Sequence, residues 1–166
     1  MKPELQLYLK NKFPKLYTEH TVECPFTQRG FECDDGWFRL VLWLSRYLQS
    51  YIDKQNEWTK LYPDTYLPVT QIHVEQVKEK FGTLRFYKYG GNEHTNSIIS
   101  FAEYISGFIC ETTGKTDNIG YSKKGYIKTS HQSLGRRNDF NPIDDSELLE
   151  ILSGQKEFSL DIDKKD

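Results

Sequence analysis

Long apolar runs are absent from this 166-residue chain. No stretch approaches the ~20 consecutive apolar residues that a membrane-spanning helix requires. The first residues, 1–4, do not begin an apolar segment of the signal-peptide type. We therefore expect a cytoplasmic protein without a membrane partner. The length suits one domain that buries a core without metal or disulfide bonds.

Cysteine is also scarce, and the three thiols belong to Cys24, Cys33 and Cys110. An odd number of widely spaced cysteines does not suit a disulfide framework. We interpret them instead as small buried hydrophobic side chains.

Catalytic signatures are missing as well. The chain has no Walker phosphate-binding loop, no Gly-x-Ser-x-Gly turn, no dinucleotide-binding glycine pattern and no His-x-x-x-His metal motif. Adjacent carboxylates occur at Asp34-Asp35 and Asp144-Asp145. Both pairs fit the first turn of a helix, where an acid accepts hydrogen bonds from backbone N–H groups. No catalytic residue is therefore nominated, and a binding protein is favoured over an enzyme.

Charge is distributed unevenly around a net value of −2. Residues 118–138 contain five basic side chains and no acid, whereas residues 139–166 contain nine acids and three lysines. Tyrosines alternate with the lysines of the basic segment, and such a pattern can neutralise phosphates and stack on bases. The charge pattern thus raises nucleic acid as one partner class.

Hydrophobic spacing predicts an α+β fold. Apolar residues recur with helical periodicity over residues 35–53 and 96–111, and they alternate over residues 71–89, which suits a hairpin of a small antiparallel sheet. We expect the two helices to pack on this sheet and a further hairpin to follow residue 114. A single domain is expected over residues 1–154, ending in a helix after Pro142, with a frayed acidic tail at 155–166.

One segment, QVKEKFGTLRFY at residues 76–87, carries a family resemblance. Asp35-Gly36-Trp37-Phe38 and the stretch from residue 102 to Gly114 match in the same order. The chain resembles an uncharacterised family of small proteins encoded by phages and prophages. The resemblance implies a setting rather than a chemistry: the cytoplasm of an infected bacterial host, where phages often use compact proteins to counter host defence.

Relatives in that family carry a zinc-knuckle-like Cys-x-x-Cys-Gly segment followed by a further Cys and a His. In this chain Thr113 stands at the second cysteine position, so only Cys110 and His131 remain as metal ligands. Structural zinc requires four N or S ligands. We therefore expect no zinc and no other cofactor.

The predicted ligand-binding residues fall in two groups. Around the turn of the predicted hairpin lie Lys78, Lys80, Arg85 and Tyr87, and the basic segment adds Lys123, Lys124, Tyr126, Lys128, Arg136 and Arg137. Arginine forks and lysine point charges can grip an anion. The same residues also suit a solvated sheet edge paired with Glu75 and Glu79, and tyrosines that pack a small sheet.

Three functions stay open at this point. The first is a non-catalytic binding protein that counters host defence by binding a host protein or by sequestering a nucleotide signal. The second is a nucleic-acid-binding accessory protein that uses residues 118–138. The third is a small enzyme acting on a nucleotide, which would need a pocket containing Arg85, His73 and an acid. The sequence leaves the identity of the ligand and the oligomeric state open.

Overall fold

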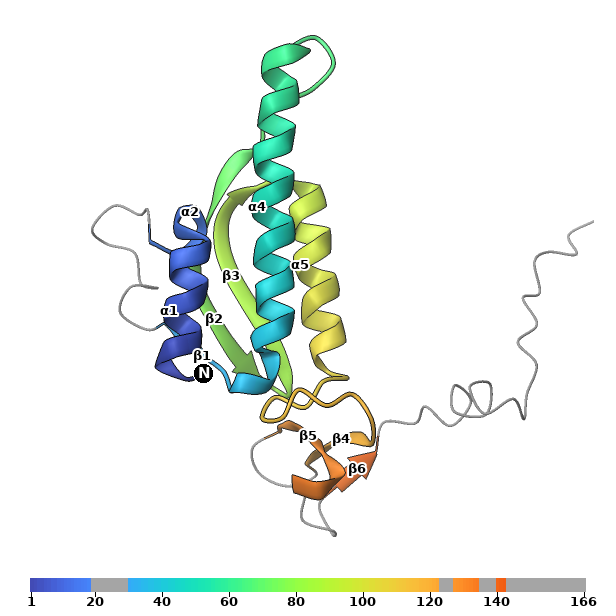
Figure 1. Ribbon diagram of the computed structural model, residues 1–166. Coiled ribbons are helices and arrows are strands. Elements are labelled where there is room, and N and C mark those ends of the chain that lie inside the picture. The colour runs from blue at the N-terminus through green and yellow to red at the C-terminus, as the bar shows by residue number, and fades with distance from the viewer. Residues whose placement is uncertain (19–29, 123–126, 135–139, 143–166) are drawn as a thin grey trace, which may run out of the picture.

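The computed structural model describes residues 1–18, 30–122, 127–134 and 140–142 (Figure 1). The elements are α1 (Pro3–Lys12), α2 (Pro14–Tyr17), β1 (Phe31–Glu32), the 3-10 turn η1 (Asp35–Trp37), α4 (Phe38–Leu61), β2 (Thr70–Lys80), β3 (Thr83–Gly91), α5 (Glu93–Ser106), β4 (Ile119–Ser122), β5 (Thr129–His131), the 3-10 turn η2 (Gln132–Leu134) and β6 (Phe140–Pro142). This arrangement confirms the predicted α+β class. The helix predicted after Pro142 and the acidic tail lie outside the described residues.

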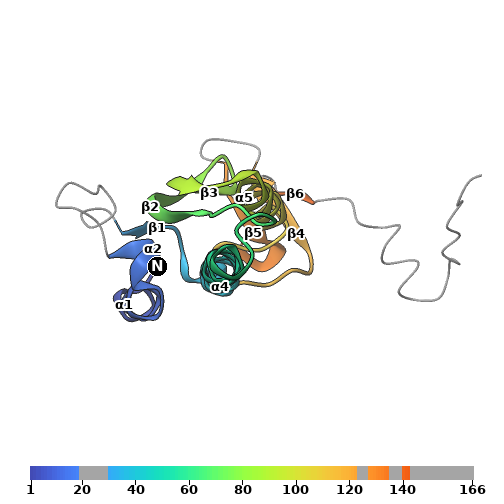
Figure 2. The same ribbon diagram turned by 90° about the horizontal axis from the view of Figure 1, so that it is seen from above.

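The larger sheet has the strand order β1-β2-β3. Strands β2 and β3 form the predicted antiparallel hairpin, and β1 joins β2 in parallel with Phe31 opposite Val77. Helices α2 and α4 lie against β2 on one face of this sheet, α1 packs on α2, and α5 lies along β3 (Figure 2). The sheet is therefore mixed rather than purely antiparallel. The two-residue strand β1 is too short to leave a periodic pattern in the sequence.

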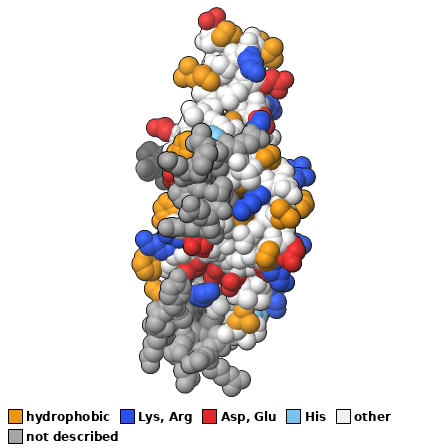
Figure 3. Space-filling view, turned by 90° about the vertical axis from the view of Figure 1, so that its left-hand side faces the viewer, with side chains coloured by type: hydrophobic (Ala, Val, Ile, Leu, Met, Phe, Trp, Pro, Cys, Tyr) orange, Lys and Arg blue, Asp and Glu red, His pale blue; other side chains and the backbone are white. Residues whose placement is uncertain are grey.

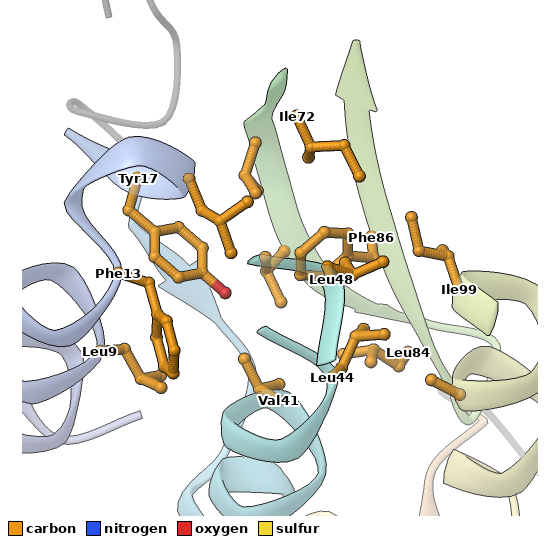
Figure 4. Packing of buried hydrophobic residues seen from close by; sticks show 14 of the residues in the cluster. Leu9, Phe13, Tyr17, Val41, Leu44, Leu48, Ile72, Leu84, Phe86 and Ile99 are labelled. Atoms are coloured by element: carbon orange, nitrogen blue, oxygen red, sulfur yellow. The ribbon is translucent and has the colours of Figure 1, made fainter. Parts of the chain in front are cut away.

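The core fills the space between the helices and the sheet (Figure 4). Helix α4 buries the stripe Val41, Leu44, Leu48 and Ile52, whose spacing presents one face of a helix. The residues that meet this stripe come from α1, α2, both hairpin strands and α5, and include Leu9, Tyr17, Ile72, Val77, Leu84, Phe86 and Ile99. Cys33 is buried and unpaired in the same cluster, as predicted.

The helix ends differ from those predicted. The expected capping of the first long helix by Asp34 and Asp35 is wrong. The Asp35 carboxylate accepts a hydrogen bond from the backbone N–H of Lys2 (2.7 Å), and Asp34 makes no capping hydrogen bond. Helix α5 begins before residue 96 because Asn92 caps it, accepting a hydrogen bond from the backbone N–H of Thr95 (3.1 Å).

A second, smaller sheet lies next to the turn of the main hairpin (Figure 1). Its strand order is β5-β4-β6, and the β4–β5 pair is the hairpin predicted after residue 114. The main hairpin turns at Phe81 (φ 54°) and Gly82 (φ 80°). A methyl group at Gly82 would lie 3.1 Å from Oγ1 of Thr129, which donates a hydrogen bond to the Gly82 carbonyl. The turn of the main hairpin therefore packs closely against β5.

The chain after α5 packs against the loop before α4. The backbone N–H of Gly36 donates to the carbonyl of Glu111 (2.7 Å), and the indole N–H of Trp37 donates to the carbonyl of Ile109 (2.9 Å). A methyl group on Gly36 would lie 2.3 Å from the carbonyl oxygen of Cys110. We call this contact region of residues 34–37, 81–82, 109–114 and 128–131 the junction. All three sequence blocks of the family resemblance contribute to it.

Candidate functional site

The four hairpin residues predicted to bind a ligand share one face of the sheet. Lys78 lies opposite Arg85, and Tyr87 lies opposite Gln76. The Lys78 ammonium lies 5.2 Å from the centre of the Tyr87 ring, and the Lys80 ammonium lies 5.4 Å from that of Phe81.

The third cation of this group, Arg85, is held by its own strand. Its guanidinium donates to Oγ1 of Thr83 (2.6 Å) and to the carbonyl of Leu84 (2.7 Å). The structure therefore brings the four residues together on one face, with their charged groups engaged by neighbouring side chains and backbone.

A polar pocket of about 460 Å³ contains two of the predicted cations, Lys78 and Lys128. Four carboxylates line the same pocket, those of Glu32, Asp34, Glu79 and Glu111. Figure 3 shows acidic side chains gathered on this side of the molecule. The N-terminal ammonium of Met1 also lines the pocket, so four carboxylates face three cations and the formal charge is slightly unfavourable for an anionic nucleotide. Neither Arg85 nor His73 lines the pocket. The hypothesis of an enzyme acting on a nucleotide requires both residues beside an acid, so this pocket does not meet it.

Lys128 is engaged in an ion-pair network at the junction. Its ammonium lies 3.3 Å from Glu111 and 3.5 Å from Asp34. The Glu111 side chain is only 3% exposed, and burial raises the pKa of its carboxyl. Burial lowers the pKa of Lys128, but the carboxylates of Glu111 and Asp34 together raise it by a larger amount, so the pKa lies above its ordinary value. Lys128 thus joins β5 to the rest of the chain.

The remaining predicted site residues, Lys123, Lys124, Tyr126, Arg136 and Arg137, lie outside the described residues. The use of residues 118–138 as a nucleic-acid surface therefore stays a prediction.

The two remaining metal-ligand positions have protein partners. Sγ of Cys110 accepts a hydrogen bond from the backbone N–H of Thr113 (3.4 Å), and His131 bonds Ser133 through Nδ1 (2.7 Å) and lies 3.4 Å from Asp117 through Nε2. Burial raises the pKa of the Cys110 thiol, but hydrogen bonds from Thr113 and the His131 backbone bring it below its ordinary value. Within the described residues no group of three or more His, Cys, Asp or Glu could hold a metal ion.

A surface that the sequence did not nominate lies between α4 and α5. It is an apolar groove of about 500 Å³, and its walls include Leu40, Trp43, Tyr47, Ile98, Phe101 and Ile105. We call it the α4/α5 groove. Toward the junction it continues into a cavity of about 880 Å³ that reaches Thr116. At its other end a hollow of about 290 Å³ follows α4 to Trp58.

Large aromatic side chains in the groove are exposed. Trp43 is 59% exposed and Phe101 is 61% exposed. Trp43 belongs to the helix predicted over residues 35–53 but lies outside its buried stripe, which runs from Val41 to Ile52 and covers the sheet. Contiguous exposed apolar surface of this kind marks an interaction site in soluble proteins.

The groove contains one positive charge, and hydrogen bonds hold two tyrosines at its end toward Trp58. The Arg46 guanidinium lies 5.3 Å from the Trp43 ring centre, and none of the described residues that line the central section carries a carboxylate. The hydroxyl of Tyr47 is hydrogen-bonded to Nε2 of His94 (2.8 Å), and that of Tyr51 accepts from Asn92 (3.0 Å). The sequence signal for this surface is an aromatic series: Trp43, Tyr47 and Tyr51 at four-residue spacing, with Trp58 seven residues further along.

No family model, curated protein or solved structure matches the chain. No helix among the described residues has both the length and the apolar character needed to cross a membrane.

Proposed function

We propose that the protein is a non-catalytic binding protein that holds an amphipathic helix of a partner protein in the α4/α5 groove. The observation that supports this most directly is the pair of exposed aromatic residues, Trp43 and Phe101, facing one apolar groove. Two packed helices that leave such a groove are a recurrent receptor for the apolar face of a third helix.

The chemistry of the groove defines its partner. Aromatic walls favour leucine-like anchors, because buried aromatic contacts supply most of the binding energy at protein interfaces. Arg46 and Lys54 lie over Trp43 and Trp58 respectively and add positive charge beside those rings. A helix with aliphatic residues on one face and carboxylates along its borders complements this surface.

The biological setting follows from the family resemblance. The proposed partner is a host defence protein of an infected bacterium, and occupation of its helix would block its action. This function needs no catalytic residue, and it uses a different surface from the hairpin cations Lys78, Lys80 and Arg85.

The test compares groove and hairpin variants of the full chain. Protein partners are captured from a bacterial lysate, and each is purified and titrated against wild type, Trp43→Glu/Phe101→Glu and Lys78→Ala/Lys80→Ala/Arg85→Ala. We expect the groove variant to weaken binding by about 2–4 kcal/mol, roughly 30-fold or more, because hot-spot aromatics are lost. The hairpin variant should bind like wild type.

The reverse result would overturn the proposal: full affinity in the groove variant together with loss in the hairpin variant. Both variants need wild-type melting curves for the comparison to count. Native mass spectrometry of the purified protein adds a second check, because a co-purified nucleotide would favour the sequestration alternative.

A further inference from the structure

The α4/α5 groove and its extension toward the junction follow α4 from Phe38 to Ser50. At a rise of 1.5 Å per residue this section of helix is about 18 Å long. A ligand helix of roughly twelve residues therefore matches its length.

The chain itself contains a segment with the complementary pattern. Residues 143–154 read IDDSELLEILSG. In a helix, four apolar residues would share one face: Leu148, Leu149, Ile151 and Leu152. Glu147 and Glu150 would border that face, and Asp144 and Asp145 would lie in the first turn at its N-terminal end. The segment contains no basic residue, whereas the described residues that line the central groove include Arg46 and no carboxylate. The extension toward the junction contains one residue of each charge, Arg39 and Asp35.

The point where this segment leaves the described structure lies near the groove. Pro142, the last residue of β6, pairs with Gly120 of β4. Gly120 follows Thr116, which lines the junction end of the groove, by four residues. Four extended residues span at most about 14 Å. The segment can thus enter the groove without a long linker.

We propose that residues 143–154 form an amphipathic helix that occupies the α4/α5 groove of the same chain, with Leu149 and Leu152 against Trp43 and Phe101. This inference rests on the proposed function. The segment covers the groove until a partner displaces it, and its composition specifies that the partner helix is acidic and leucine-rich. Tethering makes the contact effective even when the isolated segment binds weakly.

Hydrogen exchange of the full chain tests the contact. Amides of residues 143–154 should exchange slowly in wild type, and at least about tenfold faster in Trp43→Glu/Phe101→Glu and in Leu149→Asp/Leu152→Asp, since either change removes the apolar contact. The control Phe158→Asp/Leu160→Asp alters the same tail outside the segment and should retain the protection.

A second measurement uses a fluorescent synthetic peptide of residues 143–154. It should bind the Leu149→Asp/Leu152→Asp chain, whose groove is open, at least about tenfold more tightly than wild type, where the tethered segment competes. It should not bind the Trp43→Glu/Phe101→Glu chain.

Three results would overturn the inference: unprotected amides in wild type, protection that survives the groove variant, or protection that falls on dilution, which would identify a second copy as the occupant. None of these three results would contradict the proposed function. A partner whose affinity depends on Trp43 and Phe101, in a chain whose segment 143–154 is unprotected, supports the function alone.

Discussion

The hairpin face and the α4/α5 groove both combine aromatic and basic side chains, but they use them differently. At the hairpin, Arg85 donates to its own strand, and Lys78 lines a pocket crowded with carboxylates. In the groove, Trp43 and Phe101 remain mostly exposed beside Arg46, and no carboxylate is among the described residues that line the central section. The same residue types are thus engaged within the protein in one region and available to a partner in the other.

The three sequence blocks that carry the family resemblance belong to a third region, the junction. Gly36, Gly82 and the segment from Ile109 to Gly114 meet at the junction, where backbone approaches backbone closely. In this structure the blocks meet in a closely packed region. Changes at the junction should therefore reduce stability, and changes in the groove should reduce binding.

The largest expected effect is that of Gly36→Ala. The added methyl group would lie 2.3 Å from the carbonyl oxygen of Cys110 and 2.4 Å from that of Glu111, and neither backbone group can move freely. We expect the free energy of unfolding to fall by about 3 kcal/mol, which lowers Tm by roughly 6–12 °C.

Gly107→Ala is the matched control for thermal melting. A methyl group there would lie 3.4 Å from its nearest neighbours, an ordinary van der Waals distance. Equal melting temperatures for the two variants would show that the junction is not closely packed.

The next effect in size is that of Lys128→Met. It leaves the Glu111 carboxylate, which is 3% exposed, without its cation. Removing one partner of a fully buried ion pair strongly destabilises a protein, but Lys128 is 47% exposed. We therefore expect the free energy of unfolding, measured with denaturant, to fall by only about 1–2 kcal/mol. Lys115→Met, at an exposed lysine near the junction, should change little.

The pH dependence of the same variant has a defined sign. The pKa of Lys128 is raised in the folded state, so its stabilisation is complete below the ordinary value of 10.5 and is lost as pH rises through the higher folded value. The pKa of Glu111 is raised above 4.5, so the cost of burying its charge disappears in acid. The stability difference between wild type and variant should therefore be constant near neutrality and shrink at both extremes. A difference that grows above pH 10.5 would contradict the ion pair.

Local periodicity was enough to predict the hairpin and both long helices, because each buries one regular stripe. It was not enough for contacts between distant residues. Asp34 and Asp35 suited helix capping locally, yet their carboxylates lie beside Lys128 and Lys2. No pattern within a few residues contains that information.

The sequence patterns did not predict the α4/α5 groove for a related reason. Trp43 and Tyr47 adjoin the buried stripe of α4, so the sequence reads as one wide apolar face. Only the position of α5 determines which part of that face the sheet covers and which part remains open.

A smaller effect is expected from Arg46→Glu. Replacing the cation beside Trp43 should weaken binding of the 143–154 peptide to the Leu149→Asp/Leu152→Asp chain by about 1 kcal/mol, roughly fivefold, and flatten its salt dependence. Arg46→Lys keeps the charge and should retain the salt dependence in anisotropy titrations. An equal loss in both variants would assign the role of Arg46 to its packing on Trp43.

The smallest effect should come from Lys78→Ala/Lys80→Ala/Arg85→Ala. Their charges lie on the half-exposed face of the sheet, and at roughly 0.3 kcal/mol for each exposed interaction the three together contribute about 1 kcal/mol. We expect Tm within about 3 °C of wild type and unchanged binding of the peptide. A nucleotide or single-stranded oligonucleotide that binds wild type and loses affinity in this variant would show that the hairpin face is a site in its own right. The contrast with the groove would then be one of ligand class, because both surfaces would be available to partners.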